Sequence, residues 1–138
     1  MRIFIAGVMQ GSLKDKGMES QDYREAICQL VNEIHPDYET YDPFSLFPDS
    51  VKYDTQRARQ VLLAMAEEAG KSDVVVAYLP EASMGTALEM IRAYDNGKSV
   101  ISISPMAENW VVRSLSRLVF ATFDDFSAWV KNGGFNTL

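Results

Sequence analysis

Short apolar runs alternate along the chain with segments in which apolar residues recur every three or four positions. A β-branched run predicts a buried strand, and a three-to-four spacing predicts a helix with one buried face. The runs predict strands at Arg2–Gly7, Tyr38–Tyr41, Asp73–Leu79, Ser99–Ile103 and Leu118–Ala121. The spacing predicts helices from Tyr23 to Ile34, from Asp54 or Thr55 to Gly70, and at Ala87–Asn96, Glu108–Arg117 and Asp124–Lys131.

Regular alternation of strand and helix is typical of one α/β domain, here 1–138. The segment 73–79, DVVVAYL, is apolar at nearly every position, as in a central parallel strand that helices cover on both faces. Right-handed crossovers then predict a three-layer sandwich around a five-stranded parallel sheet. Ligands in such folds bind beyond the carboxyl ends of the strands.

The apolar spacing also predicts which side chains of two helices face the sheet. In the helix that ends at Gly70, which we expect to be its stop signal, these residues are Ala58, Val61, Leu62, Met65 and Ala69. In the helix after the third strand they are Ala87, Met90, Ile91 and Tyr94, which leaves Glu89 at the edge of the stripe. The segment Pro43–Lys52 is expected to be an apolar loop that lines a pocket.

Charge and composition narrow the range of partners. With 47% apolar residues the chain can build one core, and no apolar run approaches the roughly 20 residues of a membrane span, so we expect no membrane association. A net charge of −6 disfavours nucleic acid, although a helix N-terminus can still bind a small anion. A single cysteine and the absence of a leader-like N-terminus predict a cytoplasmic protein.

The sequence lacks the residues that several common types of functional site require. The turn after the first strand does not have the G-x-G-x-x-G spacing of a dinucleotide site, and no G-x-x-x-x-G-K-[ST] phosphate loop occurs. The acidic cluster of a phosphoacceptor domain is also missing. Because the chain has one histidine and one cysteine, we expect no metal site and no cofactor. His35 is interpreted as structural or surface-exposed, and Cys28 as a small buried hydrophobe.

The turn after the third strand carries the most informative residues. In 80–90, PEASMGTALEM, a glycine- and hydroxyl-containing turn runs into a helix, whose free N–H groups form an anion cradle in outline. Gly85 would admit a phosphate close to the backbone, and Ser83 and Thr86 could bond its oxygens. Glu89 follows about one turn later. The same residues also fit a plain helix with Ser83 as N-cap and Glu89 exposed, so the residues alone leave the function undecided.

The segment 73–93, DVVVAYLPEASMGTALEMIRA, resembles the signature of the nucleoside 2-deoxyribosyltransferase superfamily. The run 85–89 is similar to the G-T-A-x-E of the transferases, whose glutamate attacks the anomeric carbon. Ser83, Gly85 and Glu89 reproduce the S-x-G-x-x-x-E spacing of the related nucleoside 5′-monophosphate N-glycosidases. The resemblance implies a Rossmann-like (flavodoxin-like) sandwich, a catalytic Glu89, and a 5′-phosphate bound by Ser83 and Gly85.

The first strand and its loop extend the resemblance. In 3–12, IFIAGVMQGS, the positions that would lie against sugar and base are Gly7, Gln10, Gly11 and Ser12, and Tyr23 with Arg24 follows in the next helix. One position departs from the family, because Met65 stands where an aspartate is usual. The second carboxylate is therefore unassigned among Glu67, Glu68 and Asp54.

The activity implied is hydrolysis of a (deoxy)nucleoside 5′-monophosphate to free base and (deoxy)ribose 5-phosphate. Transfer of deoxyribose between nucleosides is the alternative, and a non-catalytic nucleotide sensor is a third possibility that Met65 favours. The resemblance further implies a homodimer or higher homo-oligomer, in which Asn109 and Ser114 reach a neighbouring site. The apolar cluster 109–112 is otherwise interpreted as mainly core.

Overall fold

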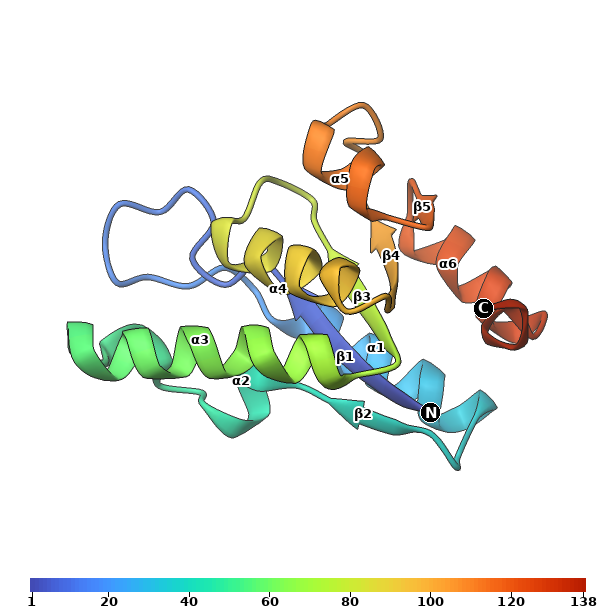
Figure 1. The fold of residues 1–138 in the computed structure, drawn as a ribbon, viewed down its shortest axis with the longest axis horizontal. Helices are drawn as coiled ribbons and strands as arrows, with labels where there is room; N and C mark the ends of the chain where they lie inside the picture. The colour runs from blue at the N-terminus through green and yellow to red at the C-terminus, as the bar shows by residue number, and fades with distance from the viewer.

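The computed structural model describes residues 1–138 and contains one five-stranded sheet in the order β2-β1-β3-β4-β5 (Figure 1). All neighbouring strands pair in parallel. The strands are β1 (Arg2–Gly7), β2 (Glu39–Tyr41), β3 (Val74–Tyr78), β4 (Ser99–Ile103) and β5 (Leu118–Phe120). The predicted flavodoxin-like α/β architecture is confirmed.

Helices cover both faces of the sheet. They are α1 (Asp22–Ile34), α2 (Pro43–Leu46), α3 (Thr55–Lys71), α4 (Met84–Asp95), α5 (Trp110–Leu115) and α6 (Phe123–Lys131), with 3₁₀ turns η1 (Ser50–Lys52) and η2 (Gly134–Thr137). Helices α1 and α6 pack with Ile3 and Ile5 in one core. Helices α3, α4 and α5 pack with Phe4 and Ala6 in the other. Alternate residues of β1 therefore serve opposite faces, as a strand requires.

The structure corrects several predicted boundaries. The expected loop 43–52 contains α2 and η1, because Asp42 caps α2 by accepting from the amide of Phe44 at 3.0 Å and Pro43 fits its first turn. Gly70 lies inside α3 instead of ending it. A Cβ there would come 2.8 Å from Cγ of Arg92, so this glycine permits α3 and α4 to pack closely. Helix α4 begins at Met84, a turn earlier than predicted.

The last two helices are also corrected. Helix α5 is shorter than predicted and follows an Asn109 cap, and α6 is capped by Thr122 instead of Asp124. Within the predicted cluster 109–112, Val112 is buried, whereas Trp110 is 78% exposed. The interpretation of that cluster as mainly core is therefore wrong.

The predicted buried faces of α3 and α4 were partly wrong. Ala58 and Leu62 are exposed, since the first turns of α3 lie beyond the carboxyl ends of the strands (Figure 1). On α4, Ile91 and Tyr94 are also exposed. The side chains of α4 that are buried are Thr86, Met90 and Ala93. Glu89 lies on the same side of α4 as the buried residues Thr86 and Ala93, at helical spacing from both. Glu89 therefore faces the interior more than its predicted place at the edge of the apolar stripe suggested.

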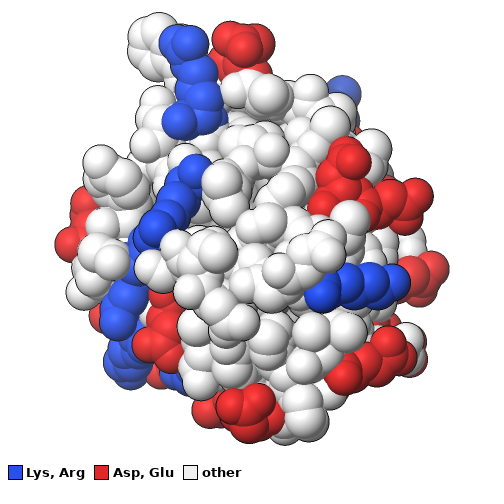
Figure 2. All heavy atoms as spheres, turned by 90° about the vertical axis from the view of Figure 1, so that its right-hand side faces the viewer, with Lys and Arg blue, Asp and Glu red and all other residues white.

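The surface carries charges of both signs. Figure 2 shows the side of the molecule on which both termini lie, with basic side chains mostly along its left margin, acidic side chains mostly along its right and lower margins, and a largely uncharged middle. No helix in the structure has both the length and the apolar character of a membrane span.

Candidate active site

The N-terminus of α4 forms a polar cradle at the carboxyl ends of the strands. The Ser83 Oγ accepts from the Thr86 amide at 3.3 Å and from the Thr86 hydroxyl at 2.9 Å. The hydroxyl proton of Ser83 is therefore free to donate elsewhere. The amides of Met84 and Gly85 lie in the first turn, where backbone N–H groups lack an intrahelical acceptor. This end of α4 can thus bind an anion through neutral donors.

A cavity of about 400 Å³ opens beside this cradle. Its polar side chains come from three separate loops and are Ser12, Ser83 and Asn109. The rest of the lining is apolar or glycine, and no lysine or arginine belongs to it. The structure therefore brings Gly11, Ser12 and Ser83 together, as the sequence predicted.

Other predicted residues lie differently. Gln10 does not line this cavity, and its side-chain amide donates to the Asp15 carbonyl at 3.4 Å within the loop. Thr86 is buried and its hydroxyl is used by Ser83, so it supports the cradle from below. At Gly85 a Cβ would meet only Cδ1 of Leu62, at 3.9 Å. The packing therefore does not require glycine at this position.

Glu89 follows Ser83 by six residues, which places it about 9 Å farther along the axis of α4. Its side chain is half-buried, has no hydrogen-bond partner in the protein and lines neither of the two main cavities. Burial raises the pKa of the Glu89 carboxyl to about 8, and the Arg24 guanidinium opposes the rise. Burial also raises the pKa of the Tyr23 hydroxyl, to which the charge of Glu89 contributes. Glu89 is therefore within electrostatic reach of Tyr23 and Arg24 at the end of β1.

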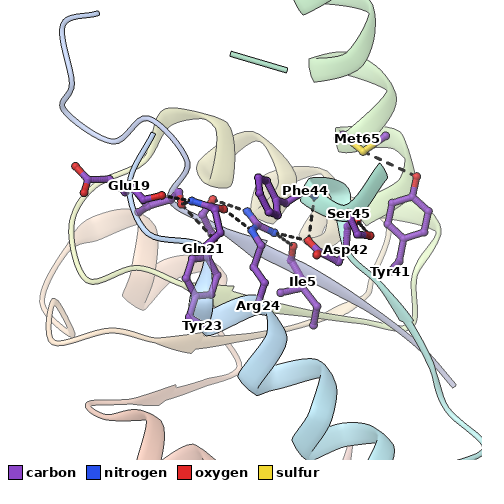
Figure 3. Close-up of polar contacts among 12 residues, drawn as sticks. Ile5, Glu19, Gln21, Tyr23, Arg24, Tyr41, Asp42, Phe44, Ser45 and Met65 are labelled. Carbon is purple, nitrogen blue, oxygen red and sulfur yellow. Dashed lines mark hydrogen bonds and ion pairs between the residues drawn. The ribbon is translucent and has the colours of Figure 1, made fainter. Parts of the chain in front are cut away.

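Arg24 ties together the ends of two strands, as Figure 3 shows. Its guanidinium is 3% exposed and donates to the carbonyls of Ile5 at 2.8 Å and Gly7 at 3.1 Å. It also donates to the Asp42 carboxylate at 3.1 Å and to the Gln21 side chain at 2.7 Å. Four of the five guanidinium N–H groups of Arg24 thus have partners within the protein, and its charge lies at the site.

Tyr23 packs across the end of β1. Its hydroxyl donates to the Val8 carbonyl at 3.1 Å, and its ring stacks on Tyr78 at a centroid distance of 4.3 Å. A Cβ at Gly7 would overlap the Tyr23 ring, which explains the glycine that closes the first strand. Gly11 has a positive φ of 53°, and a Cβ at this position would overlap the carboxylate of Glu81 in the turn after β3.

None of the candidate second carboxylates reaches this site. Met65 is buried, with its sulfur 3.9 Å from the Tyr41 hydroxyl. Glu67 pairs with an arginine of α4 at 3.2 Å, and Glu68 pairs with an arginine of β1 at 2.9 Å. Asp54 caps α3 by accepting from an amide of its first turn at 2.8 Å. The usual aspartate therefore has no replacement among them.

Asp42 was missed from the sequence, and Arg24 was named beside Tyr23 without a role. Both left a signal, because Arg24 falls on the apolar row of its helix and Asp42 directly follows the second strand.

Cys28 packs half-buried against the core, where burial raises the pKa of its thiol, and His35 stacks on Tyr38 at 4.4 Å. No group of three or more His, Cys, Asp or Glu side chains is arranged to hold a metal ion.

A parallel sheet in the order β2-β1-β3-β4-β5, with helices on both faces (Figure 1), defines a flavodoxin-like α/β protein. The chain is similar to the 2-deoxyribosyltransferase of the psychrotolerant bacterium Bacillus psychrosaccharolyticus, with a TM-score of 0.67, 17% identity and coverage of 92% of this chain and 90% of that one. It is also similar to a conserved protein of Enterococcus faecalis V583, with a TM-score of 0.63, 20% identity and coverage of 96% and 98%. No protein-family model and no curated protein matches the chain. The chain therefore has the same fold as a 2-deoxyribosyltransferase of known structure.

Proposed function

We propose that this protein hydrolyses the N-glycosidic bond of a (deoxy)nucleoside 5′-monophosphate, with Glu89 as the reacting carboxylate. One observation carries the proposal. Glu89 is half-buried without a hydrogen-bond partner, on the same helix whose N-terminus forms a polar cradle over a cavity. A half-buried carboxyl group with a strongly perturbed pKa is typical of functional sites.

The 5′-phosphate would bind the Ser83 hydroxyl and the first amides of α4, with Ser12 closing the cradle from the opposite loop. Cleavage of the bond to the base builds positive charge on the sugar. Ionised Glu89 then bonds to C1′ as the base departs, and water later attacks C1′ and releases the carboxylate. Because none of the predicted second carboxylates lies at this site, the departing base takes its proton from water.

Burial of Glu89 favours this chemistry over simple binding. Burial leaves its ionised form poorly solvated, which raises the pKa of the Glu89 carboxyl to about 8. A cationic sugar beside it would be a better partner than any group present before the reaction. The carboxylate therefore interacts more strongly with the transition state than with the ground state, which is the requirement for catalysis. Arg24 would keep a fraction of Glu89 ionised near neutral pH.

Transfer of deoxyribose between free nucleosides is the second candidate. It is favoured by the absence of lysine and arginine from the cavity lining, since a phosphate would meet only neutral donors. One protein of known structure with this fold, from Bacillus psychrosaccharolyticus, is a 2-deoxyribosyltransferase. The two activities differ in their products, because a transferase glycosylates a second free base that a hydrolase ignores.

A panel of ribo- and deoxyribonucleoside 5′-monophosphates, with the matching nucleosides, tests the proposal. We expect release of free base from a monophosphate, no release by Glu89→Gln, and much weaker release from the nucleoside. Appearance of a new nucleoside when a second base is added would establish the transferase instead. Thermal stabilisation by nucleotides without base release from the wild type would refute both activities and identify a sensor.

We also infer a cytoplasmic homo-oligomer. The outer faces of α3, α4 and α5 carry exposed apolar side chains next to the cavity. They are Leu62, Leu63, Met84, Leu88, Ile91, Trp110 and Val111. A grouping of this kind marks an interaction surface. Asn109 accepts from two amides of α5 at 3.0 and 3.4 Å, so its side-chain NH₂ remains available to a neighbour.

Light scattering after gel filtration tests the assembly. Trp110→Ser should shift the protein toward monomer, whereas Leu46→Ser, at an exposed apolar residue on α2, should not. A wild-type monomer at micromolar concentration would contradict this inference and leave the proposed chemistry to be judged separately.

A further inference from the structure

A second and larger cavity, of about 590 Å³, lies on the other side of the loop after β1. It is formed by the segment leading into α1, the end of β3 and the start of α6. Glu81 lines this cavity, while Ala82 and Ser83 line the cavity beside α4. The turn after β3 therefore separates two sites, and the proposed glycosidase chemistry uses only one of them.

The walls of the second cavity are aromatic. Tyr23 and Tyr78 stack with an interplanar angle of 19°, and both line the cavity together with Phe123. All three rings are only partly buried, so they keep surface that a ligand can cover. Aromatic rings of this kind bind flat apolar groups, and their faces attract cations. The volume is within the range of sites for small organic molecules.

The charges around the cavity have one sign. Its charged lining residues are Glu19, Asp22 and Glu81, and no lysine or arginine is among them. The Arg24 guanidinium lies 5.0 Å from the Tyr23 ring but is used by the ends of β1 and β2. The Oε1 atom of Glu81 is buried and has no hydrogen-bond partner. That oxygen is packed against Gly11, so it is the acidic lining as a whole that favours a ligand with positive charge and hydrogen-bond donors.

We infer that this cavity binds an organic cation with a flat apolar body, of the arylalkylammonium class. The aromatic walls would hold the body of the ligand, and its ammonium group would donate toward Glu81 and Asp22. Recognition of a cation here is independent of the phosphate cradle, which lies across the loop and offers donors instead of acceptors.

Titration with tryptamine tests the inference, since its amine is protonated at pH 7, and tryptophol is a matched neutral control. In low salt, calorimetry should give a tryptamine Kd below about 1 mM, and tryptophol should bind about tenfold more weakly. Glu81→Gln should weaken tryptamine binding at least about fivefold, as should raising the salt to about 0.5 M. Glu33→Gln, at an exposed glutamate of α1 outside the cavity, should leave the Kd unchanged.

Glu89→Gln should bind tryptamine as the wild type does, which separates this inference from the glycosidase proposal. If Glu81→Gln does not fold by thermal melting, Asp22→Asn takes its place with the same expectation. Equal affinity for tryptamine and tryptophol, no loss in the folded acid-to-amide variant, or no binding at about 10 mM tryptamine would each overturn the cation site.

Discussion

Replacing Glu89 with glutamine should stabilise the folded protein at neutral and alkaline pH while abolishing base release. Glutamine has nearly the shape of a protonated glutamate but never ionises. In the folded protein burial raises the pKa of Glu89 to about 8, from an ordinary value of 4.5. The native state therefore binds a proton that the unfolded chain has released over this interval, so wild-type stability falls as pH rises from 4.5 to 8.

The size of the effect follows from the same two values. One pKa unit corresponds to about 1.4 kcal/mol, so a rise from 4.5 to about 8 sets an upper limit near 5 kcal/mol. Because part of the Glu89 side chain remains exposed, solvent screening reduces this, and we expect about 1–3 kcal/mol above pH 8. Below pH 4.5 the two proteins should be almost equally stable, since Glu89 is protonated in both the folded and the unfolded state.

Urea unfolding of both proteins at several pH values between 4 and 9 measures the difference, and equal m-values would show that the unfolded states are comparable. Glu33→Gln is the matched control, because Glu33 is an exposed helical glutamate, and it should change stability by less than about 0.5 kcal/mol. If wild type and Glu89→Gln keep a constant difference across the whole pH range, Glu89 is not desolvated in the fold. The reasoning for a poised carboxylate would then fail.

Three further predictions concern the same site. Because ionised Glu89 is the attacking form, kcat/KM for a monophosphate should rise with pH and reach a plateau above an apparent pKa near 8. A kcat/KM that falls over this pH range would instead assign Glu89 as a general acid. Gly85→Ala should leave the stability unchanged or raise it by up to about 1 kcal/mol, because the added Cβ meets only ordinary contacts. The same variant should have a higher KM for monophosphates and an unchanged KM for nucleosides. Equal KM changes for both substrates would remove Gly85 from the phosphate cradle. Arg24→Met should cost about 3–5 kcal/mol in urea unfolding by leaving Asp42 buried without its cation, and a loss under 1 kcal/mol would show that the pair is dispensable.

The apolar runs of the sequence were sufficient to predict the layered fold. Strands such as β3 are apolar on both faces because helices cover them on both sides. Burial on both sides therefore requires consecutive apolar residues, which can be recognised in the sequence. The cap at Ser83 was also readable, since a hydroxyl before a helix satisfies amides only a few residues away. Features of this kind depend on neighbours in the chain.

The tertiary structure decided which faces were buried and how charges were shared. Leu62 and Ile91 belong to apolar stripes but remain exposed, because the helices extend beyond the sheet or present that side outward. Glu89 gained its raised pKa from the desolvation of its row on α4, with Arg24 opposing it from the end of β1. The pairing of Arg24 with Asp42 joins a residue of α1 to the residue that follows β2.

The sequence by itself therefore determined the α/β alternation and the local chemistry of the turn after β3. Only the folded chain decided that Glu89 is half-buried near Arg24, and that Glu81 faces a separate aromatic cavity. The physical reason is that propensity, capping and periodicity act over a few neighbouring residues, whereas desolvation and charge pairing depend on groups that meet only when distant segments pack together.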